Sequence, residues 1–114
     1  MEAIVVFVTA KDLEEGRRVA RGLLEDRLAA CVNIVGSVES HYWWEDKLEE
    51  AQECLLIVKS MRAHLDALVE RVKSLHSYTV PETVAMQVCG GNADYLSWVQ
   101  TETRTGAAAN KSSA

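Results

Sequence analysis

Two uninterrupted apolar runs constrain the fold of this chain more than any other feature. Residues 3–9 contain six apolar side chains and one threonine, and residues 54–58 are apolar throughout. Successive side chains of a strand point to opposite faces of a sheet, so a strand that is apolar at every position is buried on both faces. The two runs therefore predict two strands that are covered on both sides.

A helix and a long, bent strand are predicted between these runs. Asp12 is placed to cap a helix, Glu15 lies three residues later in the position of a capping box, and a helical apolar stripe extends to Leu24. Residues 30–44 predict a long strand that bends near Gly36 and Ser37. The first half of the chain therefore follows the order strand, helix, strand.

The second half continues with a hairpin, a helix, a strand and a last helix. Residues 45–47 predict a hairpin turn into the second apolar run, and residues 65–75 carry apolar side chains at helical spacing. Residues 83–89 alternate as a strand does, and Asn92 is placed to cap a short terminal helix. The order β-α-β-β-α-β is that of the ferredoxin-like α+β sandwich.

This arrangement predicts one domain that associates with copies of itself. The chain has 114 residues, of which 1–104 are predicted to form the single domain and 105–114, small and polar, a disordered tail. Two helices cover only one face of a four-stranded sheet, which leaves the other face of the apolar strands bare. The hairpin is also too long to be matched by its neighbours. Both features favour oligomerisation.

Residues 76–82, between the second helix and the last strand, form the strongest candidate site. Pro81 is the only proline of the chain, and it ends the helix and sets the start of the strand. His76, Tyr78 and Glu82 place an imidazole, a phenol and a carboxylate on the same connection. Binding groups are often carried on loops between rigid elements, so this segment is predicted to contribute to a binding site.

Composition excludes several classes of function. The net charge is −5 with no basic block, so neither nucleic acid nor an anionic membrane is an expected partner. The apolar runs are far shorter than the roughly 20 residues of a membrane span. Three widely spaced cysteines and an N-terminus without a basic region predict reduced thiols in a cytoplasmic protein. No catalytic triad, phosphate loop or carboxylate pair is visible, so no enzymatic activity is expected.

Several motifs, in order, resemble the CutA divalent-cation tolerance family. They occupy residues 31–33, 42–49, 76–82 and 94–98, and the similarity extends from about Ile4 to Arg104. The resemblance implies a ferredoxin-like protomer and a homotrimer in which the hairpins reach neighbouring subunits. It also implies an architecture like that of the PII signalling proteins, and an association with copper tolerance and divalent-metal binding.

The family's known copper ligands are only partly present. One bacterial version of the site uses a cysteine on the first strand and two adjacent histidines, and the corresponding residues here are Val8, Leu75 and His76. Copper and zinc need several converging ligands, yet no histidine or cysteine of this chain falls in a local metal-binding spacing. His76 and Glu82 are therefore predicted as part of a weak Cu(II) or other divalent-metal site completed across a subunit interface.

Three further residues are candidates for ligand binding. They are Tyr78, Cys31 and Trp44, and each has packing within the fold or across an interface as its alternative role. The first functional hypothesis is a trimeric divalent-cation tolerance protein. The alternatives are a PII-like sensor that binds a small metabolite without a physiological metal, and a trimeric scaffold for another protein.

Overall fold

The computed structural model describes the backbone of residues 2–108 and the side chains of residues 2–104. The predicted order of elements is confirmed, and a single 3₁₀ turn, Arg62–His64, precedes the second helix. The strands and helices are β1 (Ala3–Ala10), α1 (Leu13–Glu25), β2 (Cys31–Trp44), β3 (Lys47–Met61), α2 (Leu65–Leu75), β4 (Thr83–Gln87) and α3 (Ala93–Ala108).

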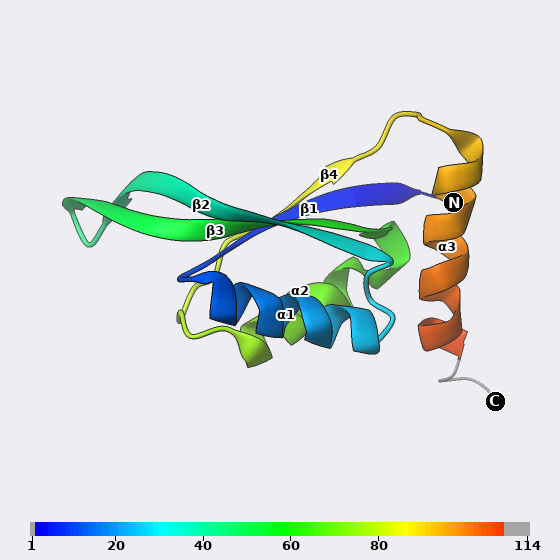
Figure 1. Cartoon of the computed structure of the whole chain (residues 1–114), viewed down its shortest axis with the longest axis horizontal. Coiled ribbons are helices and arrows are strands. Elements are labelled where there is room, and N and C mark those ends of the chain that lie inside the picture. The colour runs from blue at the N-terminus through cyan, green and yellow to red at the C-terminus, as the bar shows by residue number, and fades with distance from the viewer. Residues whose placement is uncertain (1, 109–114) are drawn as a thin grey trace.

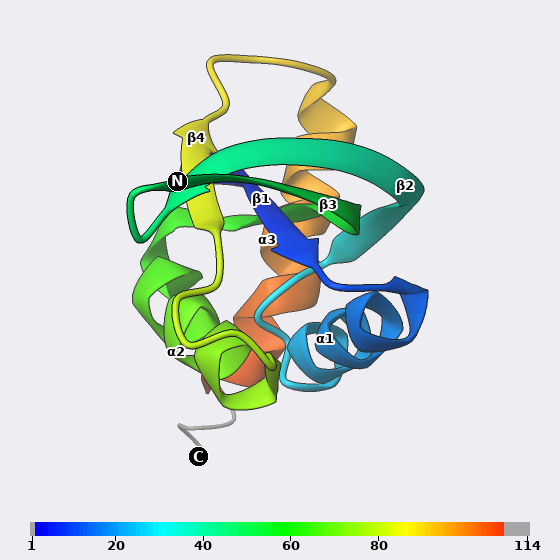
Figure 2. The same cartoon turned by 90° about the vertical axis from the view of Figure 1, so that its left-hand side faces the viewer.

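The four strands form one antiparallel sheet in the order β2-β3-β1-β4. The two apolar runs lie in β3 and β1, the two central strands, as expected for segments that are apolar at every position. Helices α1 and α2 lie side by side against one face of the sheet (Figure 1), whereas the β4–α3 connection and the start of α3 rise on the other side of it (Figure 2). The ferredoxin-like α+β fold is thereby confirmed.

The core lies between the helices and the inner face of the sheet. Alternate residues of β1 and β3 point into it and meet the apolar stripes of the two helices. Its fully or almost fully buried apolar residues include Ile4, Val6, Val8, Val19, Leu23, Leu56, Val58, Leu68 and Val72.

The outer face of the sheet is apolar and only partly covered. In the strand register, Val5 lies opposite Met86 and Phe7 lies opposite Val84, so these four side chains share the face away from the helices. Val84 and Met86 retain 52% and 44% of their exposure. The central strands were predicted to be covered on both faces. Within a single chain, this prediction holds only for the face that packs against α1 and α2.

The β2–β3 hairpin extends beyond the rest of the sheet. β3 pairs with β1 only from Cys54 onward, so residues 47–53 pair with β2 alone. The turn is one residue shorter than predicted, because Trp44 already pairs with Lys47. Glu45 and Asp46 have φ of 51° and 65°, the left-handed values of a two-residue turn that follows the twist of its strands. The predicted bend at residues 36–37 is a shift in register between Val35 and Val38.

Helix α3 differs from the predicted short helix. It continues to Ala108, four residues into the predicted disordered tail, while residues 109–114 lie outside the described part of the chain. The helix stands at one end of the sheet, beside the start of β1 (Figure 1). Val99 and Thr103 are buried there, and Arg27 forms an ion pair with Glu102 at 2.8 Å. None of the described helices is long and apolar enough to span a membrane.

Candidate functional site

One buried carboxylate joins the start of α1 to the segment before β4. Glu15 lies in the first turn of α1 and has no exposed surface. Its Oε1 accepts the backbone N–H of Lys11 at 3.0 Å, and its Oε2 accepts that of Ser77 at 2.7 Å. Asp12 caps the helix as predicted by accepting the N–H of Glu15 at 2.9 Å. In a capping box, the Glu15 carboxylate would in turn accept the backbone N–H of Asp12. This second hydrogen bond is not made here, because the carboxylate accepts the N–H groups of Lys11 and Ser77.

The surroundings of Glu15 stabilise its charged form. Burial raises the pKa of Glu15, but the hydrogen bonds from Lys11 and Ser77 outweigh this effect and hold the pKa below its usual value. Arg18 adds a longer contact, with its Nη2 3.4 Å from Oε2. Glu15 therefore holds residues 76–78 in place as an ionised hydrogen-bond acceptor.

His76, the predicted metal ligand, is buried with both ring nitrogens occupied. Its side chain has no exposed area. Its Nε2 lies 2.7 Å from the carbonyl oxygen of Thr9, and a carbonyl can only accept, so Nε2 carries the proton. Its Nδ1 accepts the backbone N–H of Tyr78 at 3.0 Å. Both ring nitrogens of His76 are therefore engaged within the chain, and the imidazole holds Tyr78 beside the end of β1.

The residues after His76 line a cleft of about 690 Å³ together with the hairpin. Three of the predicted site residues, Trp44, Tyr78 and Glu82, line this same cleft. The hydroxyl of Tyr78 donates to Oε2 of Glu53 at 2.8 Å. Burial, followed by this bond, raises the pKa of Tyr78 far above its usual value, so the phenol stays protonated. The cleft therefore contains a fixed phenol–carboxylate pair.

Cys31 lies away from this cleft. It is the first residue of β2, whereas Trp44 is the last residue of the same strand. Its Sγ donates weakly to Oδ1 of Asn33 at 3.9 Å, and burial together with the nearby Cys31 raises the pKa of Tyr95 in α3. Cys31 therefore lies beside α3 and belongs neither to the lining of the cleft nor to the described group of metal-ligating side chains.

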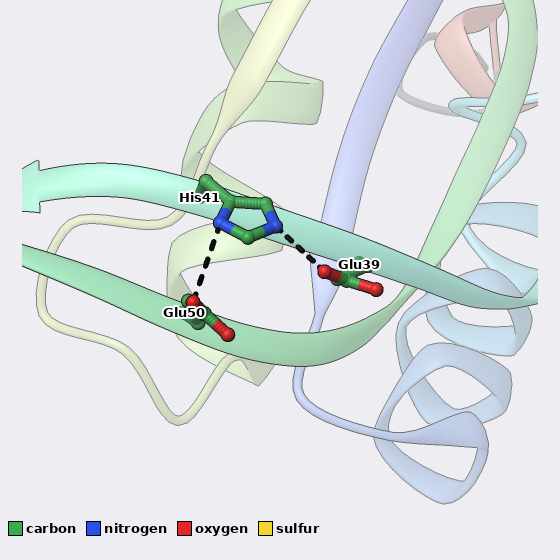
Figure 3. Close-up of side chains that lie close together, drawn as sticks. All are labelled: Glu39, His41 and Glu50. Carbon is green, nitrogen blue, oxygen red and sulfur yellow. Dashed lines mark hydrogen bonds and ion pairs between the residues drawn. The ribbon is translucent and has the colours of Figure 1, made fainter.

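A second group of polar side chains lies on the hairpin. Glu39 and His41 are two residues apart on β2, and His41 pairs with Glu50 of β3, so all three point to one side (Figure 3). The Nε2 of His41 lies 2.7 Å from Glu39 Oε2, and its Nδ1 lies 3.8 Å from Glu50 Oε2. The His41 side chain is 51% exposed. Within residues 2–104, this is the one group of three metal-ligating side chains with donor atoms inside 4.8 Å of one another.

Sequence reasoning missed Glu39 and Glu50, although a signal for both was present. A two-residue turn at positions 45–46 places residue 44 opposite 47 and, counting back along both strands, His41 opposite Glu50. Strand alternation then puts Glu39 on the same face as His41. For Glu15 and Glu53 no local signal existed, since both are buried by segments distant in sequence.

The antiparallel sheet, its paired helices and the side chains on its hairpin define a ferredoxin-like α+β protein with candidate cation ligands on an extended arm. Residues 4–102 match the family model described as CutA1 divalent ion tolerance protein. The chain belongs to the CutA1 divalent ion tolerance family, which confirms the resemblance seen in its motifs.

Relatives and solved structures agree with this assignment. The chain is 49% identical over 102 residues to "Protein CutA 1, chloroplastic" of Oryza sativa, covering 90% of this chain and 58% of that protein. It is 48% identical over 99 residues to the divalent-cation tolerance protein CutA of Thermus thermophilus, covering 87% and 96%. The crystal structure of CutA1 from Oryza sativa superposes with a TM-score of 0.88 at 48% identity, covering 91% and 95%.

The prediction of a cytoplasmic protein is wrong as an inference from this sequence. The rice relative is named chloroplastic. A further solved structure, from Archaeoglobus fulgidus, is described as a periplasmic divalent cation tolerance protein, with a TM-score of 0.86, 39% identity and 89% and 98% coverage. Proteins of this fold therefore carry names from several compartments. The number of cysteines does not distinguish these compartments, because all three cysteines are free. An N-terminus without a basic region does not distinguish them either.

Proposed function

We propose that this chain serves divalent-cation tolerance by binding a divalent cation, with Cu(II) as the first candidate, on the β2–β3 hairpin. The observation that carries the proposal is the convergence of Glu39, His41 and Glu50. One imidazole nitrogen and two carboxylate oxygens suit copper and zinc, and all three side chains are accessible from solvent. The proposed role is binding alone, without catalysis.

The geometry favours this group over the residues first predicted as ligands. Both ring nitrogens of His76 are engaged, whereas those of His41 face only carboxylates that would also bind the ion. Glu82 lines the cleft, but it belongs to no described group of three metal-ligating side chains.

Titration calorimetry with Cu(II) and Zn(II) tests the metal site. We expect His41→Ala to weaken binding about tenfold or more, because it removes the only nitrogen ligand of the group. Affinity should also fall as the pH is lowered, since protons compete with the metal for the imidazole. The matched control is His64→Ala, which removes a histidine outside the group. Unchanged Cu(II) affinity in His41→Ala, or a comparable loss in His64→Ala, contradicts the assignment.

We propose further that the chain assembles as a homotrimer. Support comes from the exposed apolar face that carries Val84 and Met86, and from a hairpin whose residues 47–53 have no third strand beside them. Light scattering at micromolar concentration should give three times the 12.6 kDa mass of the chain. A mass near 12.6 kDa would overturn this proposal, and charged substitutions at Val84 and Met86 should lower the mass if the face is the interface.

A second candidate function is the binding of a small molecule, as in the PII-like alternative. The specific observation in its favour is the cleft between the hairpin and residues 77–82. Its volume of about 690 Å³ falls within the range of small-molecule sites. Its wall is held in place by the hydrogen bonds of Glu15 and His76. This function does not require a metal.

A further inference from the structure

The cleft that Trp44, Tyr78 and Glu82 line is acidic. Two carboxylates, Glu53 and Glu82, belong to its lining, and none of the described lining residues is a lysine or an arginine. Glu53 retains only 8% of its exposure, and its one described side-chain partner is the neutral hydroxyl of Tyr78. No described lysine or arginine forms an ion pair with Glu53 or Glu82. Among residues 2–104, the two carboxylates of the cleft therefore have no lysine or arginine partner.

The same cleft is rich in aromatic surface. Tyr42, Trp44 and Tyr78 line it beside the two carboxylates. Tyr42 and Trp44 retain 41% and 49% of their exposure, so their rings are available for contact. Aromatic faces attract cations, most strongly where water is partly excluded, and they also cover the hydrocarbon part of an organic ligand. Aromatic walls beside one buried and one exposed carboxylate suit a cation that carries apolar groups.

We infer that the cleft binds a small organic ammonium ion, with its charge directed to Glu53 and Glu82 and its hydrocarbon part against Trp44 and Tyr78. This inference rests on the small-molecule function proposed above and names the class of ligand. The bond from Tyr78 orients the Glu53 carboxylate and leaves its Oε1 to accept an ammonium N–H. The ligand site and the metal group share His41, which also lines the cleft, whereas Glu39 and Glu50 belong to the metal group alone.

Three probes of nearly the same shape but different charge distinguish the effect of ligand charge on binding from that of ligand size. Benzylamine is a cation at neutral pH, benzyl alcohol is neutral, and benzoate is an anion. Each is titrated into the full chain and followed by heteronuclear NMR at the tryptophan indole N–H groups. We expect benzylamine to bind about tenfold or more tightly than benzyl alcohol, since charged hydrogen bonds are stronger than neutral ones, and benzoate to bind least. The signal of Trp44 should move while that of Trp98, in α3, stays in place.

Matched variants then assign the charge. Glu53→Gln keeps the shape of the side chain and an acceptor for Tyr78, and we expect it to weaken benzylamine binding about tenfold. Glu82→Gln should weaken it less, because this carboxylate is exposed. The control is Glu70→Gln, the same charge change on the 73% exposed side chain of an α2 residue, which should leave binding unchanged.

The outcomes distinguish a failure of the ammonium inference from a failure of the proposed small-molecule function. If benzoate or benzyl alcohol binds at Trp44 as tightly as benzylamine, the cleft is a small-molecule site and the ammonium inference is wrong. If none of the three probes moves the Trp44 signal, both the inference and the small-molecule function fail. If Glu53→Gln and Glu70→Gln weaken benzylamine equally, the effect is one of net charge and the assignment to the cleft is overturned.

Discussion

Replacing Glu15 with alanine is expected to lower the free energy of unfolding by about 3 kcal/mol, because it removes a buried acceptor used by two separate segments. The backbone N–H groups of Lys11 and Ser77 both lose their partner. Each donor left without a partner costs about 1–3 kcal/mol, and the space left by the side chain adds to this cost. The loss should appear as a lower urea midpoint at a fixed protein concentration.

Two variants show whether the effect comes from the carboxylate. Glu15→Gln keeps the volume and one acceptor oxygen, so it should lose less stability than Glu15→Ala. Glu14→Ala changes an exposed glutamate in the same turn of α1 and should stay within about 0.5 kcal/mol of the unchanged protein. If Glu15→Ala is no less stable than Glu14→Ala, the carboxylate does not hold the two segments together.

The pH dependence of stability gives the same prediction a second measurement. The folded protein lowers the pKa of Glu15, so its contribution is present above the unfolded pKa, about 4.3, and is lost as the pH falls through the lower folded pKa. The unchanged protein should therefore lose more stability than Glu15→Gln between neutral pH and acid. An equal loss in both proteins would contradict the lowered pKa.

Gly16→Ala is expected to destabilise the protein by about 2 kcal/mol, although alanine is the better helix former. A Cβ at Gly16 would lie 2.5 Å from Sγ of Cys54, which is fully buried in β3. The thiol has little freedom to move, because it donates to the carbonyl oxygen of Asp12 at 3.2 Å. The glycine therefore lets α1 approach the sheet closely, and the measurement is the change in melting temperature or urea midpoint.

A double variant isolates this contact. Removing the sulfur in Cys54→Ala makes room for the new methyl group, so Gly16→Ala combined with Cys54→Ala should be more stable than Gly16→Ala alone, with a coupling of about 1–3 kcal/mol. Gly22→Ala is the control, because its Cβ would meet the tip of Leu75, a longer side chain that can change rotamer. Strictly additive losses at residues 16 and 54 would show that the contact does not limit the packing.

The parts of the fold that were predictable from sequence are those that depend on neighbouring residues. The runs at 3–9 and 54–58 identified β1 and part of β3, because unbroken runs of β-branched and other apolar residues are typical of strands. Asp12 identified the start of α1, because its side chain accepts a hydrogen bond from the backbone N–H of Glu15, only three residues ahead. Periodicity and capping are properties of one segment, and the sequence displays them directly.

The candidate site was only partly predictable, because its geometry depends on distant segments. Residues 76–82 were identified from Pro81 and the polar groups around it, and most of them line the cleft. The burial of His76 was not predictable, since it follows from its bond to Thr9, 67 residues earlier in the chain. Residues that share a site without sharing an element leave no periodic signal. For this reason Glu53 was missed, and Glu15 was identified only as a capping residue and not as the partner of Ser77.

The position of β1 in the sheet has a consequence for biosynthesis. Of the four strands of the sheet, β1 is synthesised first, yet it is central, and one of its two edges pairs only with β4 at residues 83–87. The β1–β3 pairing can form earlier, which leaves an apolar strand with a free row of hydrogen-bonding groups until most of the chain has been translated. The nascent chain is therefore exposed to aggregation through this strand edge until β4 emerges.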